Sequence, residues 1–530
     1  MKGIRKEIGA RRNLKFRLVI ESLLIGVLTG IIISVFRKAT QFLSSKFLLL
    51  YEFGQSSFLH AGIVLLLLMV VGLIVGIMVK IDPKIGGSGI PQVAGELRGL
   101  IKTDWRRILP LKYFGGILSV SAGLKIGREG PSIQMGAAVG QGFSEVFKRP
   151  KTEKTFLISS GAAAGLAAAF NTPLSGLVFA LEEVHHNFSS VALVSAMSAS
   201  LSAGLTSALV LGYKPVLYVE RLAHIPFRVY GYLMIMAFLA SLSAFLFTGG
   251  ISVGKKIYAR LKIPVVAKVM IPFLITGIVI LLNTDLYGSG EHFILLSDGA
   301  HLTIEKLLFI YFVTIVLLII AFSSGLPGGI FFPMLVLGSL FGNMFGQILA
   351  QLGLIDGNLI LVFAVLSMCA YFSAIVRSPI TGIILILELT GSFHFLLPLG
   401  VVALVSYLTA EFFRLKPVYE MLLTYQLHPE LLVGKPMQAK EKRKKNPRES
   451  SIVVEFPVYF NSKCDGRYIK DIDWPKGVLL VSIKRGDREI LPKGDVKLLG
   501  GDYIVCVHDV DELDALKEKI HIITQEEIPE

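Results

Sequence analysis

The same arrangement of glycine and proline occurs twice in this chain, about 200 residues apart. Gly127-Arg128-Glu129-Gly130-Pro131 corresponds to Gly329-Ile330-Phe331-Phe332-Pro333, and an apolar stretch follows each proline. Further motif pairs keep nearly the same offset, namely residues 87–89 with 288–290 and residues 171–182 with 377–388. Motifs in the same order at nearly constant spacing indicate an internal duplication. Two hydrophobic halves that are broken at matching positions are typical of secondary transporters.

The composition of the chain excludes an ordinary soluble protein. Hydrophobic residues make up 53% of the sequence, and the mean hydropathy is +0.66. Residues 18–36 and 61–78 are long enough to cross a bilayer, which takes roughly 20 residues per helix. Residues 132–147 are shorter and rich in glycine, which predicts a partial span. The first apolar stretch is too long for a removable signal peptide and lacks a cleavage pattern. We therefore predict an all-α polytopic membrane protein with an inverted-topology repeat.

Basic residues are concentrated beside the apolar segments. Residues 1–17 hold seven Lys or Arg and one Glu, and residues 440–449 hold six and two. Because basic segments next to membrane helices mark the cytoplasmic side, we expect both termini inside the cell and the body in the inner membrane of a prokaryote. The net charge of +14 therefore indicates a lipid bilayer as partner and no nucleic acid. The three cysteines are outside metal-ligand or redox spacings, so we expect plain thiols, no metal and no cofactor.

Changes in composition divide the chain into parts. The predicted parts are a basic cytoplasmic arm over 1–15, a transmembrane domain over 16–434 with repeats at roughly 16–214 and 227–434, a charged linker over 435–450, and a cytosolic domain over 451–530. The arm is expected to form an amphipathic helix on the membrane surface.

The last part of the chain is predicted to be a small α+β domain. Residues 453–459, 478–484 and 502–508 alternate or are β-branched, and residues 510–520 have a helical pattern. Together with the Leu-Gly-Gly-Asp run at 499–502, this segment resembles the TrkA-C (RCK-C) domain of potassium-transport regulators. The resemblance implies a domain that dimerises and binds a small ligand. The residues themselves identify no ligand, and an assembly domain without a ligand is the alternative.

The glycine–proline motifs are suited to holding an anion inside a bilayer. Backbone amides and hydroxyls at helix N-termini attract an anion, whereas a full positive charge would trap it. Glycine lets the ion approach the main chain, and proline in the first turn starts the helix. Four segments fit this description: Gly87-Ser88-Gly89-Ile90-Pro91, Gly127–Pro131, Gly329–Pro333 and Lys416-Pro417-Val418-Tyr419. Each motif alone could mark a simple kink, but four together predict an anion site.

With these motifs in order, the chain resembles the CLC family of chloride channels and proton-coupled chloride transporters over roughly residues 15–425. The run GAAAGLAAAFNTPLSGLVFALEE at 161–183 extends the resemblance. The family implies a homodimer in which each subunit holds its own pore, with chloride as substrate. It also implies that chloride is coordinated by the Ser88 and Tyr419 side chains and by the amides of Ile330 and Phe331.

Two glutamates are candidates for proton transfer. A carboxylate at Glu129 could take the place of the anion when ionised and swing away when protonated, and an intramembrane acid is a functional candidate by default. By resemblance, Glu129 is the external gate and proton acceptor, while the alternative is a helix cap. Glu183, the second of the Glu182-Glu183 pair, matches the internal proton-transfer residue of family exchangers. A structural salt bridge is the alternative for either member of the pair.

The residues also separate the competing functions. Family channels usually lack an acid at position 183, which favours Cl⁻/H⁺ exchange over a passive voltage- or ligand-gated chloride channel. Nitrate-preferring relatives tend to carry proline where this chain has Ser88, which favours chloride. A potassium or solute transporter regulated by the tail is the alternative from another class, but a TVGYG-type filter is absent from the sequence. No Walker, zinc-helix or nucleophile-elbow motif occurs, so an enzyme is not expected.

Overall fold

The computed structural model consists of two compact units, residues 1–436 and 437–530, and each is considered by itself. The structure describes residues 2–185, 189–213, 217, 223, 225–290, 293–294, 302–433, 451–458, 462–475, 478–485, 488–509 and 520.

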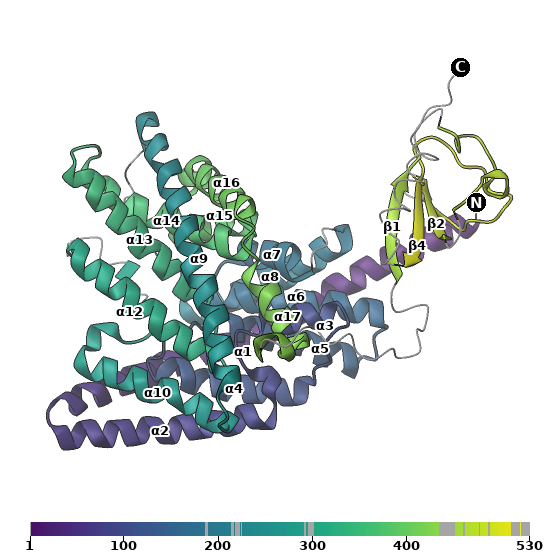
Figure 1. The fold of residues 1–530 in the computed structure, drawn as a ribbon. Coiled ribbons are helices and arrows are strands. Elements are labelled where there is room, and N and C mark those ends of the chain that lie inside the picture. Colours follow the sequence, from purple (N-terminus) through teal and green to yellow (C-terminus); the bar gives the residue numbers. More distant parts are fainter. Residues whose placement is uncertain are drawn as a thin grey trace. The chain divides into compact units, whose positions relative to one another are not determined.

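The first unit is built almost entirely from helices (Figure 1). The helices are α1 (Lys2–Gln55), α2 (Phe58–Ile81), α3 (Ile90–Leu97), α4 (Trp105–Ser121), α5 (Glu129–Val146), α6 (Lys151–Phe170), α7 (Pro173–Phe179), α8 (Ser190–Leu211), α9 (Tyr230–Arg260), α10 (Val265–Leu282), α12 (Ile304–Ser323), α13 (Phe331–Gln351), α14 (Ile360–Val376), α15 (Pro379–Thr390), α16 (Leu396–Phe412) and α17 (Val418–Leu427). Within the described ranges, nine helical segments are long and apolar enough to cross a bilayer. The predicted polytopic membrane architecture is thus confirmed.

The N-terminal arm and the first membrane span form one continuous helix. Helix α1 begins at Lys2 and extends without a break to Gln55, so the arm is not a separate helix. Its most apolar part is within residues 15–55. The position of residues 2–15 on a membrane surface stays a prediction.

The repeated glycines explain why corresponding helices pack closely in the two halves. Helix α5 lies against α6, and a Cβ added at Gly136 would collide with the carbonyl of Gly161. Helix α13 lies against α14 in the same way, and a Cβ at Gly338 would lie 2.8 Å from the Ser367 carbonyl oxygen. Small residues therefore let both helix pairs approach backbone to backbone, as in other membrane bundles.

The two Gly-Ser-Gly loops have matching backbone conformations. In the first copy, Gly87 and Gly89 have φ of 70° and 92°. In the second copy, Gly288 and Gly290 have φ of 68° and 87°. Residues with side chains avoid this left-handed region, which gives a physical reason for glycine at all four positions. The duplication read from the sequence is therefore also a duplication of local structure.

The second unit contains a four-stranded antiparallel sheet. Its strands are β1 (Ser451–Pro457), β2 (Leu479–Arg485), β3 (Arg488–Ile490) and β4 (Tyr503–Asp509), in the order β1-β4-β2-β3. Three of these strands match the predicted ones to within two residues at each end. The short strand β3 was not predicted, because three residues are too few to show alternation. The predicted helix over 510–520 lies outside the described residues except for Ile520.

An ion pair between half-exposed Arg485 and buried Asp502 explains the last residue of the Leu-Gly-Gly-Asp run. The guanidinium of Arg485 donates to both carboxylate oxygens of Asp502, at 2.7 and 2.8 Å. Asp502 also accepts from the amide of Leu499 at 2.9 Å, which closes the turn. Hydrogen bonding to Asp502 raises the pKa of Arg485 further above its ordinary value. The Leu-Gly-Gly-Asp run is thus required by the fold of the tail.

Candidate anion and proton site

Three glycine-rich loops are joined at the centre of the membrane unit by short backbone pairings. Gly127 and Gly329 exchange two hydrogen bonds, at 2.7 and 2.8 Å. The amide of Gly87 donates to the carbonyl of Leu326 at 2.9 Å, and the amide of Gly328 donates to the carbonyl of Gly87 at 3.1 Å. The segment 326–329 therefore connects the first and second glycine loops, so the starts of α3, α5 and α13 come together.

Ser88 lies at the start of α3 and is 1% exposed. Its hydroxyl oxygen accepts from the amide of Ile90 at 3.3 Å. Gly130 brings α5 directly against it, since a Cβ at Gly130 would be 2.5 Å from the Ser88 carbonyl oxygen. Only glycine at position 130 allows this approach, which places the hydroxyl of Ser88 beside the first turn of α5.

Glu129 begins α5 and is 2% exposed. A Cβ added at Gly127 would collide with the Oε2 atom of Glu129, so the carboxyl group folds back over the glycine loop. A carboxylate in this position lies at the N-terminal end of α5, where the helix dipole favours a negative charge. The structure therefore places Glu129 where an anion would also be attracted.

Ile330 and Phe331 form the start of α13, and both are fully buried. By their position in the first turn, their amides have no acceptor within the helix. The Phe331 ring packs against Phe170, Phe179 and Phe372, with centroids 5.6, 5.7 and 5.0 Å away. This aromatic cluster joins the ends of α6 and α7 to α13 and fixes the position of the amides.

Tyr419 lies in the first turn of α17 and is 2% exposed. Its buried hydroxyl has no hydrogen-bond partner within the described ranges. Because buried hydroxyls in folded proteins are nearly always paired, this unpaired donor fits an anion as its partner.

The neighbouring glutamates Glu182 and Glu183 have different environments. Glu182 caps α15, accepting from the amides of Ile380 and Thr381 at 3.3 and 2.8 Å and from the Thr381 hydroxyl. Glu183, which is 7% exposed, accepts from the Ser378 hydroxyl at 2.8 Å. Both lie on a turn of π-helix over Ala180–His185, a feature often found at functional sites.

Lys112 is a site residue that the sequence analysis missed. It is fully buried in α4, and its ammonium donates to the carbonyls of Ile85 and Gly87, at 2.7 Å each. The Lys112 side chain thus holds the main chain just before Ser88. A lysine in the middle of an apolar segment was the signal that could have identified it.

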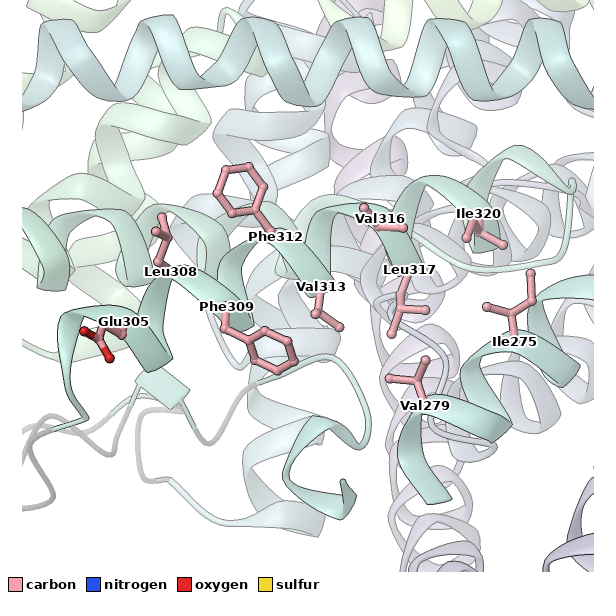
Figure 2. Close-up of a pocket in the computed structure, with 10 residues that line it drawn as sticks. All are labelled: Ile275, Val279, Glu305, Leu308, Phe309, Phe312, Val313, Val316, Leu317 and Ile320. Atoms are coloured by element: carbon pink, nitrogen blue, oxygen red, sulfur yellow. The ribbon is translucent and has the colours of Figure 1, made fainter. Parts of the chain in front are cut away.

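An apolar groove lies on the surface between α10 and α12, and its lining differs from the polar lining of the candidate anion site (Figure 2). Its walls include Val279 of α10 and the exposed side chains of Leu308, Phe309 and Phe312 of α12. The one charged side chain in its lining is Glu305, an acid. Such a groove suits lipid chains and offers no donor for an anion.

Comparison with known proteins agrees with this geometry. Residues 70–411, more than half of the chain, match the voltage-gated chloride channel family, and this range holds the Glu129, Glu183 and Ile330 positions. The chain belongs to this family. Residues 453–521 match the TrkA-C domain, so the resemblance of the tail is also confirmed.

Curated members of the voltage-gated chloride channel family include the H⁺/Cl⁻ exchange transporter ClcA of Cronobacter sakazakii. It is 35% identical over 66% of this chain and 76% of its own length. ClcA of Salmonella paratyphi B is 32% identical over 76% of this chain and 87% of its own length.

Solved structures in the same family have the same fold. A slow cyanobacterial Cl⁻/H⁺ antiporter has a TM-score of 0.70 and 29% identity over 78% of this chain and 98% of its own. A CLC-type fluoride/proton antiporter has a TM-score of 0.64 and 26% identity over 76% of this chain and 97% of its own.

Proposed function

We propose that this protein exchanges chloride for protons across the inner membrane of a bacterium. The observation that carries the proposal is the buried hydroxyl of Tyr419 at the start of α17, which has no hydrogen-bond partner within the described ranges. Glu129 and Glu183, the two candidates for proton transfer, are both buried in the same unit. The Cl⁻/H⁺ exchange of the ClcA relatives and of the cyanobacterial antiporter supports the same function.

In the proposed mechanism, chloride is held by the hydroxyls of Ser88 and Tyr419 and by the amides of Ile330 and Phe331. When Glu129 is ionised, its carboxylate competes with the anion for the positive ends of the helices. When Glu129 takes a proton, that attraction is lost and the anion can pass. Glu183 passes the proton to and from the cytoplasmic side, where Ser378 holds its carboxyl group.

The experiment uses the purified protein in liposomes with an imposed chloride gradient and no proton gradient. Exchange predicts that chloride movement drives protons uphill, recorded as a pH change in the lumen. Chloride movement without proton movement would instead establish the passive channel, and no chloride movement would overturn both.

The orientation and assembly are part of the proposal. We expect both termini in the cytoplasm because of the basic segments at 1–17 and 440–449. We also expect a homodimer, as the family resemblance implies. Labelling of a cysteine introduced into either basic segment, from each side of oriented vesicles, tests the first expectation. Cross-linking in native membranes tests the second.

The TrkA-C tail is proposed to regulate transport by binding a small ligand. Deletion of residues 440–530 would then alter the transport rate or remove its response to candidate nucleotides. Unchanged transport and an unchanged response in the deletion variant would make the tail an assembly domain.

A further inference from the structure

A small polar cavity lies between α3 and α5, and the proposed transport mechanism makes no use of it. Its polar lining consists of Gln92 and Glu96 of α3, Thr103 of the following loop, and Gln134 of α5. Its volume is about 10 Å³, which is room for one particle the size of a water molecule.

Two glutamines that line this cavity have unpaired amide oxygens. The amide nitrogen of Gln92 donates to the carbonyl of Gly86 at 2.7 Å, and that of Gln134 donates to the carbonyl of Lys84 at 3.0 Å. These bonds fix which end of each amide is nitrogen. The oxygens of both are buried and accept no hydrogen bond from any residue that the structure describes. Two buried acceptors therefore lack donors at the wall of one cavity.

Glu96 supplies a carboxylate to the same wall. One of its oxygens accepts from the Thr103 hydroxyl. The charged groups that face Glu96 are Lys154, Glu145 and Lys84, but Lys154 pairs with Glu145 at 2.9 Å, and the Lys84 ammonium donates to the main chain of Lys102. The nearby cations thus have other partners.

We propose that this cavity binds a small monovalent cation, for which Na⁺ is the best fit. Its wall offers two amide oxygens that lack donors and a carboxyl group. Oxygen atoms of this kind replace the hydration shell of a hard cation. Within the described ranges, no group of three His, Cys, Asp or Glu side chains forms a metal site. A single carboxylate balances a single positive charge, which favours a monovalent ion.

The proposed cation site is next to the anion site. Gln92 lies in the first turn of α3, four residues after Ser88. A Cβ at Gly89 would lie 2.6 Å from the Gln134 amide oxygen, so the Gly-Ser-Gly loop packs on the wall of the cavity. A bound cation therefore adds positive potential near the chloride. Because such coupling is reciprocal, Na⁺ and chloride would each strengthen the binding of the other. This last consequence rests on the proposed function, whereas the cation site itself does not.

The test compares thermal unfolding of the purified full-length protein in sodium, potassium and choline salts at equal ionic strength. We expect Na⁺ to raise the unfolding temperature in a saturable way, K⁺ to do so more weakly, and choline not at all. Glu96→Gln should weaken Na⁺ binding, so that the half-saturating Na⁺ concentration rises at least about tenfold. Glu305→Gln is the control, because this carboxylate is on α12 and outside the cavity, and its variant should keep the sodium effect.

A second variant covers the case in which Glu96→Gln does not fold. Thr103→Val removes only the hydroxyl that orients Glu96, and it should shift the sodium titration in the same direction. Equal unfolding temperatures in sodium and choline, or an undiminished sodium effect in either variant, would overturn the site and leave water as the occupant. Chloride titrations in both salts separate the two proposals, since a sodium effect without chloride binding would contradict only the transport function.

Discussion

Glu182 and Glu388 each cap a helix of the opposite repeat. The carboxylate of Glu182 accepts from the amide of Thr381 at 2.8 Å, and that of Glu388 accepts from the amide of Ser175 at 2.7 Å. The two residues are 206 positions apart and hold corresponding places in the repeats, so one contact is the counterpart of the other. These two caps therefore join α7 to α15. Glu182 is engaged in its cap, whereas Glu183 accepts from the hydroxyl of Ser378.

Removing either cap should destabilise the protein without changing its substrate. Glu388→Ala leaves the amides of Leu174 and Ser175 without their acceptor, which costs about 1–2 kcal/mol, as for other helix caps. Glu182→Ala should lower the stability by a similar amount, because the bonds of Glu182 to α15 correspond to those of Glu388 to α7. Thermal unfolding in detergent measures both. A large loss in one variant and none in the other would contradict the equivalence of the two caps.

Lys112→Met should weaken chloride binding. The variant removes two hydrogen bonds that hold the first glycine loop beside Ser88. We expect chloride affinity to fall about tenfold, since leaving buried carbonyls unpaired costs about 1–3 kcal/mol and loosens the loop. Isothermal titration with chloride provides the measurement. Unchanged affinity in a folded variant would show that the ammonium has only a structural function.

Ser88→Pro should shift selectivity from chloride towards nitrate. The substitution removes a buried hydroxyl at the start of α3 and, by family resemblance, creates the residue that nitrate-preferring relatives carry. Relative permeation of the two anions in liposomes gives the ratio, with Ser144→Ala of α5 as a control for the loss of a buried hydroxyl elsewhere. An unchanged ratio would show that Ser88 does not contribute to selection.

The thiols of the tail should be unreactive at neutral and mildly alkaline pH. Burial raises the pKa of Cys506 to about 12 and also raises that of Cys464. An unfolded thiol ionises near pH 8.5, so the contribution of Cys506 to stability is complete below that pH and is lost as pH rises towards 12. Labelling with a thiol reagent at pH 8, before and after denaturation, checks this. Rapid labelling of Cys506 in the native tail would contradict its burial.

The sequence predicted which helix starts meet better than it predicted the side-chain contacts around them. Glycine and proline mark helix starts at membrane depth, and the structure brings the starts of α3, α5 and α13 together as those motifs indicated. The same pattern does not show which carboxyl group faces which helix. The separation of Glu182 from Glu183 depends on α15, nearly 200 residues away, and so does the cap at Glu388. Long-range contacts of this kind have no local signal in the chain.

Lys112 and Glu96 show a second limit of sequence reasoning. An anion site built from amides and hydroxyls gave no reason to look for a lysine or an acid beside the loop. Lys112 is buried in α4 and Glu96 is half-buried on α3, and only the packed structure shows what their side chains contact. The strands of the tail, in contrast, were predicted closely because alternation is a local property.

The most direct test of the account compares Glu183→Gln with Glu182→Gln in liposomes under a chloride gradient. The account predicts that Glu183→Gln retains chloride movement but loses uphill proton movement, because this carboxyl group carries the proton on the cytoplasmic side. Glu182→Gln, whose amide oxygen can still cap α15, should keep both. Proton movement that persists in Glu183→Gln, or that is lost only in Glu182→Gln, would contradict the assignment of Glu183.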